Sequence, residues 1–287
     1  MPQNPQEIKE RIEGVDNIRQ VTRAMKMVAD AKLKKAQKSI EQARPYAYKI
    51  NNILRQLLPQ IDRSVNRLLE IREPENIGLV VITADRGLCG AFNSRIIRRT
   101  EEELEKYSSD QVRLICIGKK GLRYFQRRDY NILDEYTDFF RDLNFDNAMS
   151  VVDVITDQFL RYDLDEVDII YNEFKNVVQQ DVVVEQFLPL TVAEDEEPES
   201  LSEFLLEPGE TEVVNSLVPR HLNVQMWRML LESNAAEQGA RRTAMDNATE
   251  NAEEMIQDLN LEFNKARQSK ITTEISEIVS GAEAMKE

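Results

Sequence analysis

Apolar and small side chains recur every three or four residues near both ends of this 287-residue chain. At the N-terminal end, ten steps carry the recurrence over 35 residues, a mean spacing of 3.5 residues. That spacing is the period of a coiled coil rather than of a straight helix. The positions are Ile8, Ile12, Val15, Ile18, Thr22, Met25, Ala29, Leu33, Ala36, Ile40 and Ala43. The sequence therefore predicts a long helix whose apolar stripe needs a partner.

Pro45 follows this stripe, and the apolar pattern resumes after it as far as Leu68. Because proline has no backbone N–H and its ring clashes with the preceding helical turn, we expect a kink or a break near Pro45. Residues 1–70 are thus predicted as a first helical region with a kink near this proline.

The C-terminal region has the same character and is longer. From Pro219 to about Gly281 there is no second proline and only one internal glycine, Gly239. At 1.5 Å per residue, some 60 helical residues would make a rod of about 90 Å. Residues 213–287 are therefore predicted as a second long helix. Its stripe comprises Leu222, Met226, Met229, Ser233, Ala236, Ala240, Ala244, Ala248, Met255, Leu259, Phe263, Ala266, Ile271, Ile275 and Ile278.

Neither stripe is wide enough to build a core alone, so the simplest prediction pairs the two end helices antiparallel. Small residues on both sides would let the axes approach closely: Ala24, Ala29, Ala31 and Ala36 on one, and Ala235, Ala236, Gly239, Ala240 and Ala244 on the other. A homodimeric coiled coil through one helix is the alternative. The longer C-terminal helix should project beyond its partner and expose an apolar tip, which usually marks a contact with another protein. That tip would carry Ile271, Ile275, Ile278, Val279, Ala282 and Met285.

The middle of the chain has a different pattern. Short β-branched runs at 77–84, 112–118, 165–174 and 181–190 are typical of buried strands, with helical stretches at 92–106, 119–128 and 145–162. Alternating strands and helices indicate a parallel, Rossmann-like, doubly wound α/β domain. We assign it to residues 71–212, including an acidic, proline-containing connection at 193–212. The predicted fold class is α/β plus an antiparallel two-helix coiled coil.

Charge is distributed unevenly within a net charge of −15. Residues 1–69 carry 14 basic against 7 acidic side chains, whereas residues 134–212 carry 3 basic against 23 acidic ones. The N-terminal region could therefore meet an acidic partner, while the middle region would repel nucleic acid and anionic lipid.

The sequence supplies little material for an active site. Its one histidine, His221, leaves almost nothing for a metal cluster or a Ser/His catalytic pair, and no P-loop motif occurs. We expect Cys89 and Cys116 to be reduced and buried. The segment DRGLCGAFNS (85–94) lies where a phosphate loop would, but it lacks the dinucleotide-binding spacing. Gly87 and Gly90 more simply shape a tight strand-to-helix turn capped by Asn93 or Ser94. We predict no catalytic residue, cofactor or metal, no signal peptide and no membrane span.

Several stretches resemble the gamma subunit family of F-type (rotary) ATP synthases. They are VTRAMKMVADAKLKKAQ (21–37), DRGLCGAFN (85–93), LVPRHLNVQMWRMLLES (217–233), NKARQ (264–268) and ITTEISEIVSGAEA (271–284). In the last, Thr272, Glu274, Glu277, Gly281 and Ala282 match the family signature. The likeness extends in order over nearly the whole chain.

This resemblance implies a central-stalk rotor subunit without catalysis of its own. The partners would be three alpha and three beta subunits, the epsilon subunit and the membrane c-ring. The subunit would lie at the cytoplasmic side of a bacterial inner membrane. Arg23, Met25 and Lys26 would face an acidic lever segment of a beta subunit. Arg267, Gln268, Thr272, Glu274 and Glu277 would make the upper contacts with the ring. Asp85, Arg86, Gly87, Gly90 and Gly281 match structural positions of the family.

The alternatives are a coiled-coil scaffold or adaptor unrelated to rotation, and an α/β nucleotide-binding enzyme with helical additions. Chloroplast and cyanobacterial members of the family carry an inserted regulatory segment. Neither that insert nor a closely spaced cysteine pair occurs here, so regulation by thiols is not expected.

Overall fold

A computed structural model describes residues 4–177, 179–191, 207 and 209–284. The chain divides into two compact units. One, here called the coiled-coil unit, comprises Met1–Val28 and Arg242–Glu287. The other, called the α/β unit, comprises Ala29–Arg241.

Two long helices run through both units. Helix α1 spans Pro5–Leu57 and helix α5 spans Glu210–Ala284. Helix α1 is not interrupted at Pro45, so the predicted break does not occur, because one lost hydrogen bond leaves the bonds of the neighbouring turns in place. Three short 3₁₀ turns follow α1, at Leu58–Gln60, Arg63–Val65 and Arg67–Leu69.

Helix α5 begins at Glu210, just before the predicted region of residues 213–287, and Pro219 lies inside it. The expected acidic connection at 193–212 lies mostly outside the described residues, but its last three residues are helical. The division of the chain at residues 70 and 212 stays a prediction from the sequence.

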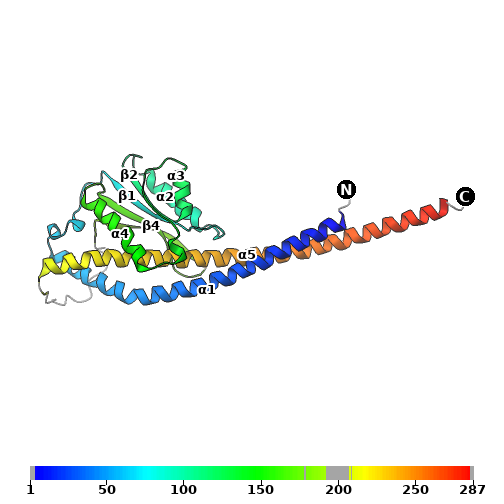
Figure 1. Cartoon of the computed structure of the whole chain (residues 1–287), viewed down its shortest axis with the longest axis horizontal. Coiled ribbons are helices and arrows are strands. Elements are labelled where there is room, and N and C mark those ends of the chain that lie inside the picture. Colours follow the sequence, from blue (N-terminus) through cyan, green and yellow to red (C-terminus); the bar gives the residue numbers. More distant parts are fainter. Residues whose placement is uncertain (1–3, 178, 192–206, 208, 285–287) are drawn as a thin grey trace. The chain divides into compact units, whose positions relative to one another are not determined.

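The α/β unit is built on one five-stranded sheet (Figure 1). Its strands are β1 (Ile77–Ile82), β2 (Val112–Ile117), β3 (Ile132–Tyr136), β4 (Glu166–Phe174) and β5 (Gln180–Leu188). The strand order is β3-β2-β1-β4-β5, with β1 paired in parallel to both β2 and β4. The helices between the strands are α2 (Phe92–Leu104), α3 (Lys119–Gln126) and α4 (Phe145–Leu160), and Phe139–Arg141 forms a 3₁₀ turn.

Two features of the sheet differ from the prediction. Strand β5 is antiparallel to β4, so the sheet is mixed rather than parallel. Only residues 175–179 join the two strands, and a parallel pairing would need a crossover of a dozen or more residues. Strand β3 was not predicted. It lies at the sheet edge with partly exposed side chains, so its sequence ILDEY lacks the apolar run of a buried strand.

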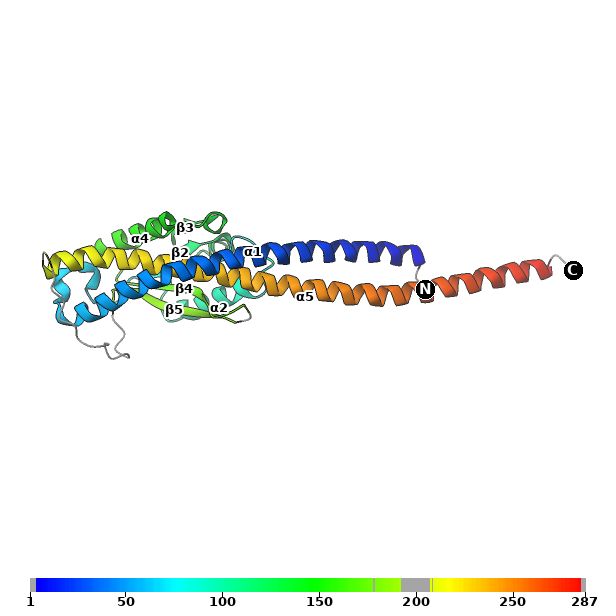
Figure 2. The same cartoon turned by 90° about the horizontal axis from the view of Figure 1, so that it is seen from below.

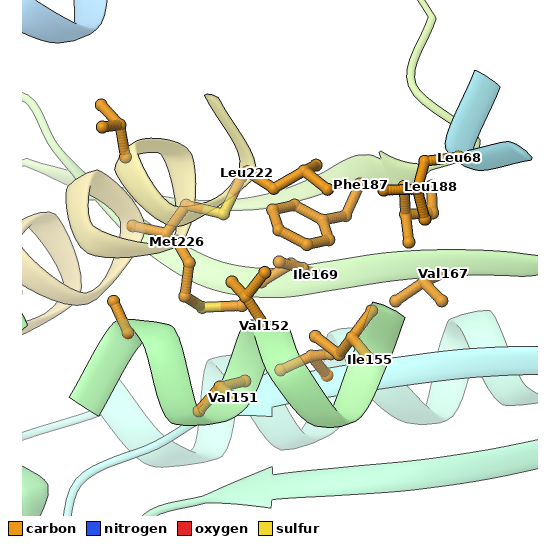
Figure 3. Packing of buried hydrophobic residues seen from close by; sticks show 14 of the residues in the cluster. Leu68, Val151, Val152, Ile155, Val167, Ile169, Phe187, Leu188, Leu222 and Met226 are labelled. Atoms are coloured by element: carbon orange, nitrogen blue, oxygen red, sulfur yellow. The ribbon is translucent and has the colours of Figure 1, made fainter. Parts of the chain in front are cut away.

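Hydrophobic side chains cover both faces of the sheet, as expected for a doubly wound domain. One face packs against α2 and α3, with Ile96 and Phe125 fully buried. The other packs against α4, the first part of α5 and part of α1. Figure 3 shows this second core, with Leu222 beside Phe187 and Met226 pointing toward Val152. The N-terminal part of α5 is therefore part of the domain core.

Within the α/β unit, α1 and α5 meet through a small cluster. Leu33, Ala36 and Ile40 of α1 pack with Leu231 and Ala235 of α5. Ala36 and Ala235, both predicted to lie between the two helices, belong to this cluster. Helix α1 therefore has a partner helix in its own chain, which counts against the homodimeric alternative. Two other predicted seam residues have different neighbours. Ala236 packs into the sheet core, and a Cβ added at Gly239 would meet Phe174, Val177 and Gln180 around the β4–β5 hairpin.

In the coiled-coil unit the two helices run antiparallel. Thr22 Oγ1 and Thr249 Oγ1 lie 2.8 Å apart, Lys26 forms an ion pair with Asp246, and Arg19 reaches Glu253 at 4.0 Å. Higher numbers in α1 thus meet lower numbers in α5. In Figures 1 and 2 the N-terminal part of α1 runs beside α5, and α5 continues beyond it toward the C-terminus.

The stripe in this unit keeps a seven-residue repeat. Ile8 and Thr22 are buried on α1, and Met245, Ala252 and Leu259 are buried on α5. Apart from the isoleucines of the predicted exposed tip, two residues assigned to the stripe are exposed instead: Ile18 at 57% and Met255 at 50%. Spacings of three and four residues fit both the buried stripe of a helix and the positions next to it. Without the partner helix the two cannot be told apart, and Ile18 and Met255 were therefore misassigned.

The contact of Ala235 with α1 leads to a prediction. Ala235 is fully buried, so Ala235→Leu would push the two helices apart at a cost of about 1–3 kcal/mol. A drop in Tm of several degrees is expected for a chain of this size, measured by calorimetry on the full chain. Ala24→Leu makes the same change at an exposed position of α1 and should leave Tm nearly unchanged. Equal melting temperatures for the two variants would contradict the close packing at Ala235.

Candidate partner-contact sites

The predicted contact with an acidic lever segment, here called the lower contact, comprises Arg23, Met25 and Lys26. It lies on α1 in the coiled-coil unit. Arg23 is exposed, Met25 is half-buried, and Lys26 is held by its ion pair with Asp246. The charge of Lys26 is therefore paired within the chain, whereas no ion pair of Arg23 occurs among the described residues. Of the two cations, Arg23 is the better placed to meet an acidic partner.

The structure adds apolar neighbours to this contact. Ile18, Val21 and Val28 are each more than half exposed. Their spacing puts them on the same face of α1 as Met25, since residues three, four and seven apart lie on one side of a helix. Four apolar residues in a row on an exposed helix face indicate a surface for another protein. The sequence held this second stripe, but Ile18 had been assigned to the intramolecular one.

The upper predicted contact lies on the part of α5 that extends past α1. Arg267, Gln268, Thr272, Glu274 and Glu277 are all exposed. Their described polar contacts are within the helix: Thr272 Oγ1 donates to the Gln268 carbonyl at 2.9 Å, and Lys270 lies 3.9 Å from Glu274. Such exposed pairs contribute little to stability, so these side chains can turn to a partner at small cost.

Apolar residues of the same segment are exposed as well. Ile271, Ile275 and Ile278 recur at helical spacing, and Ile278 is 71% exposed. The apolar tip predicted from the sequence is thus present for these residues and for Val279. The side chains of Ala282 and Met285 lie outside the described set.

The two contacts are distinct sites. Lys26 contacts Asp246, and Thr272 lies 26 residues further along the same helix. At 1.5 Å per residue the separation is about 40 Å. The chain does not bring the lower and upper sets together, so a single partner domain of ordinary size would meet one or the other.

The turn after β1 is built as a rigid connection in the α/β unit. Asp85 Oδ1 accepts hydrogen bonds from the backbone N–H groups of Lys119 and Asp138, at 3.1 and 3.0 Å. Gly90 has a φ of +56°, a left-handed conformation that glycine adopts without strain. The Asp85 carboxylate places negative charge at the strand ends, where a nucleotide phosphate would need positive or neutral groups. These hydrogen bonds tie the turn to the ends of the neighbouring strands.

The predicted helix cap at this turn was wrong. The N-cap of α2 is Ala91, which offers no side-chain hydrogen bond. Asn93 Oδ1 instead accepts from the Ala84 N–H at 2.9 Å, and Ser94 Oγ donates to the Ala91 carbonyl. Both residues are already inside the helix, so their side chains reach back to the end of β1 and to the preceding turn.

Arg241 connects this turn to α5, a contact the sequence did not reveal. Its Nη1 donates to the Gly87 carbonyl at 2.7 Å, and its Nη2 is bonded to the buried carboxylate of Glu237. Burial raises the pKa of Glu237, and the Arg241 guanidinium opposes that rise. The four-residue spacing of Glu237 and Arg241 was the available signal. Arg86 makes no such contact among the described residues and is exposed in the turn.

Gly281 has no local structural reason to be glycine. It is helical and exposed, and a Cβ built on it would meet nothing within 4 Å. Glycine within a helix costs up to about 1 kcal/mol relative to alanine. A glycine at an exposed helical position can allow a partner to approach closely. No contact among the described residues requires a glycine at position 281.

The described residues hold no cluster of His, Cys, Asp and Glu that could bind a metal ion. None of the described helices is long and apolar enough to cross a membrane. Cys89 and Cys116 are buried and unpaired, as expected, and burial raises the pKa of the Cys116 thiol to about 12.

Comparison with known proteins identifies the family. A family model described as ATP synthase matches residues 4–285. The ATP synthase gamma chain of Salinibacter ruber is 47% identical over 304 residues, covering 99% of each chain, and that of Chlorobaculum tepidum is 45% identical over 287 residues, covering 98% of each. The chain belongs to the ATP synthase family, among its gamma chains.

Solved structures agree with this assignment. A chain of the Tetrahymena thermophila mitochondrial ATP synthase central stalk and c-ring matches with a TM-score of 0.63 and 27% identity, covering 79% of this chain and 99% of that one. A chain of the Euglena gracilis mitochondrial ATP synthase matches with a TM-score of 0.69 over 98% of this chain and 94% of that one; at 20% identity it supports the fold alone. Family membership displaces the unrelated scaffold and the nucleotide-binding enzyme as interpretations.

The Arg241 contact can be tested by a double-mutant cycle. Arg241→Gln would leave the Glu237 carboxylate buried without its partner and should destabilise the chain by about 3 kcal/mol. Glu237→Gln combined with Arg241→Gln should cost less than the two single changes together, because no charge is then left alone. Denaturant unfolding of the four proteins measures the coupling. Strictly additive changes would contradict the ion pair.

Proposed function

We propose that the chain is the central-stalk rotor subunit of a proton-translocating F-type ATP synthase. In this role it couples rotation of the membrane ring to conformational change in the catalytic beta subunits. Membership of the gamma chain family supports the proposal. So does the architecture, in which an α/β unit and an antiparallel coiled coil share two continuous helices.

One observation carries the mechanism: the coiled-coil unit has no rotational symmetry. It presents two helices with different side chains along the α1 segment, and α5 alone beyond it. Three equivalent subunits around such a shaft would each meet a different face at any instant. Differences in contact free energy would then bias each catalytic site toward a different state, and turning the shaft would exchange those states.

The lower contact would act on the acidic lever segment of a beta subunit. Arg23 provides the charge, and Met25 with its exposed apolar neighbours provides a surface to push against. The excess of basic residues in 1–69 favours an acidic partner. Arg267, Gln268, Thr272, Glu274 and Glu277 would form the upper contact with the ring, about 40 Å away along α5.

The remaining partners follow from the same proposal. The chain would supply no catalytic group, and the ring of three alpha and three beta subunits would carry out the chemistry. The α/β unit would bind the epsilon subunit and the c-ring, which places the chain at the cytoplasmic side of a bacterial inner membrane. Native mass spectrometry of the purified complex tests this arrangement: it should contain one copy of the chain for three alpha and three beta subunits. A different ratio would refute the rotor assignment.

Met25→Lys should impair coupling. The added charge would bind the acidic lever more tightly and hinder passage from one beta subunit to the next, so the ratio of proton pumping to ATP hydrolysis in membrane vesicles should fall about threefold. Asn247→Lys adds the same charge at an exposed position of α5 in the same unit and serves as control. If the Met25→Lys ratio equals that of wild type, the lower contact is misassigned.

Removing two polar groups of the upper contact should slow the motor. Arg267→Ala together with Gln268→Ala deletes exposed side chains that have no structural role in the chain, so its Tm should not change. ATPase activity of the complex reconstituted with alpha and beta subunits should fall about threefold. The matched control, Gln257→Ala with Asp258→Ala, alters two exposed residues earlier in α5. Equal activity in both complexes would remove these residues from the ring contact.

A further inference from the structure

A large pocket lies in the α/β unit, and its lining shares no residue with either contact site. Its volume is about 960 Å³, at the upper end of the range for small-molecule sites. Three segments form it: the end of α1 and the next residue, from Arg44 to Leu58, β5 and the residues after it, from Glu185 to Thr191, and α5 from His221 to Met229. Nothing in the proposed coupling mechanism uses it.

The walls are largely apolar. The apolar lining residues are Ala47 and Leu54 of α1, Leu58 of the next 3₁₀ turn, Phe187 of β5, Leu190 after it, and Leu222 and Met229 of α5. Phe187 and Leu222 lie side by side in Figure 3. Such walls suit the hydrocarbon or aromatic body of a ligand.

The charged groups of the lining favour an anion. Three arginines, Arg44, Arg55 and Arg228, line the pocket against one carboxylate, Glu185. That carboxylate is paired: Arg228 Nη2 donates to its two oxygens at 2.7 and 2.9 Å, and Tyr171 donates to Oε2 at 2.9 Å. The one carboxylate of the lining is therefore held by an arginine, in a chain whose net charge is −15.

Arg44 is the group best placed to receive the anion. It is exposed at the rim, and no ion pair or hydrogen bond of its side chain occurs among the described residues. Arginine binds carboxylate, sulfonate and phosphate groups through paired N–H donors. Arg228 is occupied by Glu185, Glu232, Gln225 and Tyr171, so its role is to pair with these carboxylates rather than to bind the ligand.

A buried polar group in the lining also lacks a partner. His221 is only 5% exposed, and its Nδ1 makes no hydrogen bond within the described part of the chain. Burial, and then the nearby Arg228 charge, lower the pKa of His221 to about 4, so the ring is neutral at physiological pH. A buried polar atom without a partner is uncommon in folded proteins, and a bound molecule can supply that partner.

We propose that this pocket binds a small amphipathic anion, with the apolar body between α1, β5 and α5 and the acidic group at Arg44. A ligand bound there would contact both long helices and the edge strand at once. Occupancy would thus stabilise the α/β unit in the arrangement described here, because a ligand that binds only the folded state adds to its stability.

The test uses a matched pair of fluorescent probes with the full chain. 1-Anilinonaphthalene-8-sulfonate carries an anionic group, and N-phenyl-1-naphthylamine has the same aromatic body without it. The sulfonate should bind with saturation at one site per chain and at least about tenfold more tightly than the neutral probe, as expected for one charge-assisted contact. Equal affinities for the two probes would overturn the anion preference.

Two substitutions separate the anion contact from the apolar body. Arg44→Gln should weaken binding of the sulfonate about tenfold and leave the neutral probe unaffected. Lys49→Gln removes the same charge from a nearby exposed position of α1 that does not line the pocket, and it should change neither affinity. Asn51→Trp should fill the space and abolish binding of both probes. Equal effects of Arg44→Gln and Lys49→Gln would refute the role of Arg44.

Methionine methyl NMR on the unaltered chain locates the probe without relying on a variant that could misfold. Met229 lines the pocket, whereas Met255 is exposed on the coiled-coil unit. Met229→Leu and Met255→Leu assign the two resonances. The sulfonate should shift the Met229 signal and leave Met255 in place. A shift of Met255 alone would mean that the probe binds exposed apolar residues of the coiled coil, and the pocket proposal would fail.

Discussion

Close packing of small side chains between α1 and α5 is the contact on which the rest of the structure depends. Ala36 and Ala235 allow Leu33, Ile40 and Leu231 to interdigitate between the two helices. A larger residue at either alanine would separate the helices, and the apolar sides of both would then face water. The same helices continue into the coiled-coil unit, so their packing in the α/β unit sets the starting point of that pairing.

Helix α5 serves two different environments along its length. Its N-terminal part is fully buried at Leu222 and Met226 and completes one core of the sheet. Its C-terminal part is almost entirely exposed, including Ile271 and Ile275. Two ion pairs lie along the helix, one partly exposed and one buried: Arg228 binds Glu185 of β5, and Arg241 binds Glu237 and the turn after β1. These pairs hold the helix against the domain at two points.

Much of this architecture could be predicted from periodicity alone. The spacing of apolar residues identified both long helices and their antiparallel pairing, and the β-branched runs identified four of the five strands. Strand β3 was not predicted because an edge strand needs no apolar run, and its sequence includes the acidic residues Asp134 and Glu135. Ile18 and Met255 were misplaced because a stripe one position wide cannot be separated from its neighbour without the partner helix. The pocket was invisible in the sequence, since it joins residues more than 130 positions apart.

The hydrogen bond between Thr22 and Thr249 has a mechanical consequence. Sliding α5 by one heptad would still offer Lys26 an acid, Glu253 in place of Asp246, but it would set Thr22 against Ile256. The two threonine hydroxyl groups would then lose their hydrogen bond in a largely apolar seam. That loss costs free energy, whereas a purely aliphatic seam has no such hydrogen bond to lose. Under load, the two strands of this coil should therefore resist longitudinal slip and twist as one body.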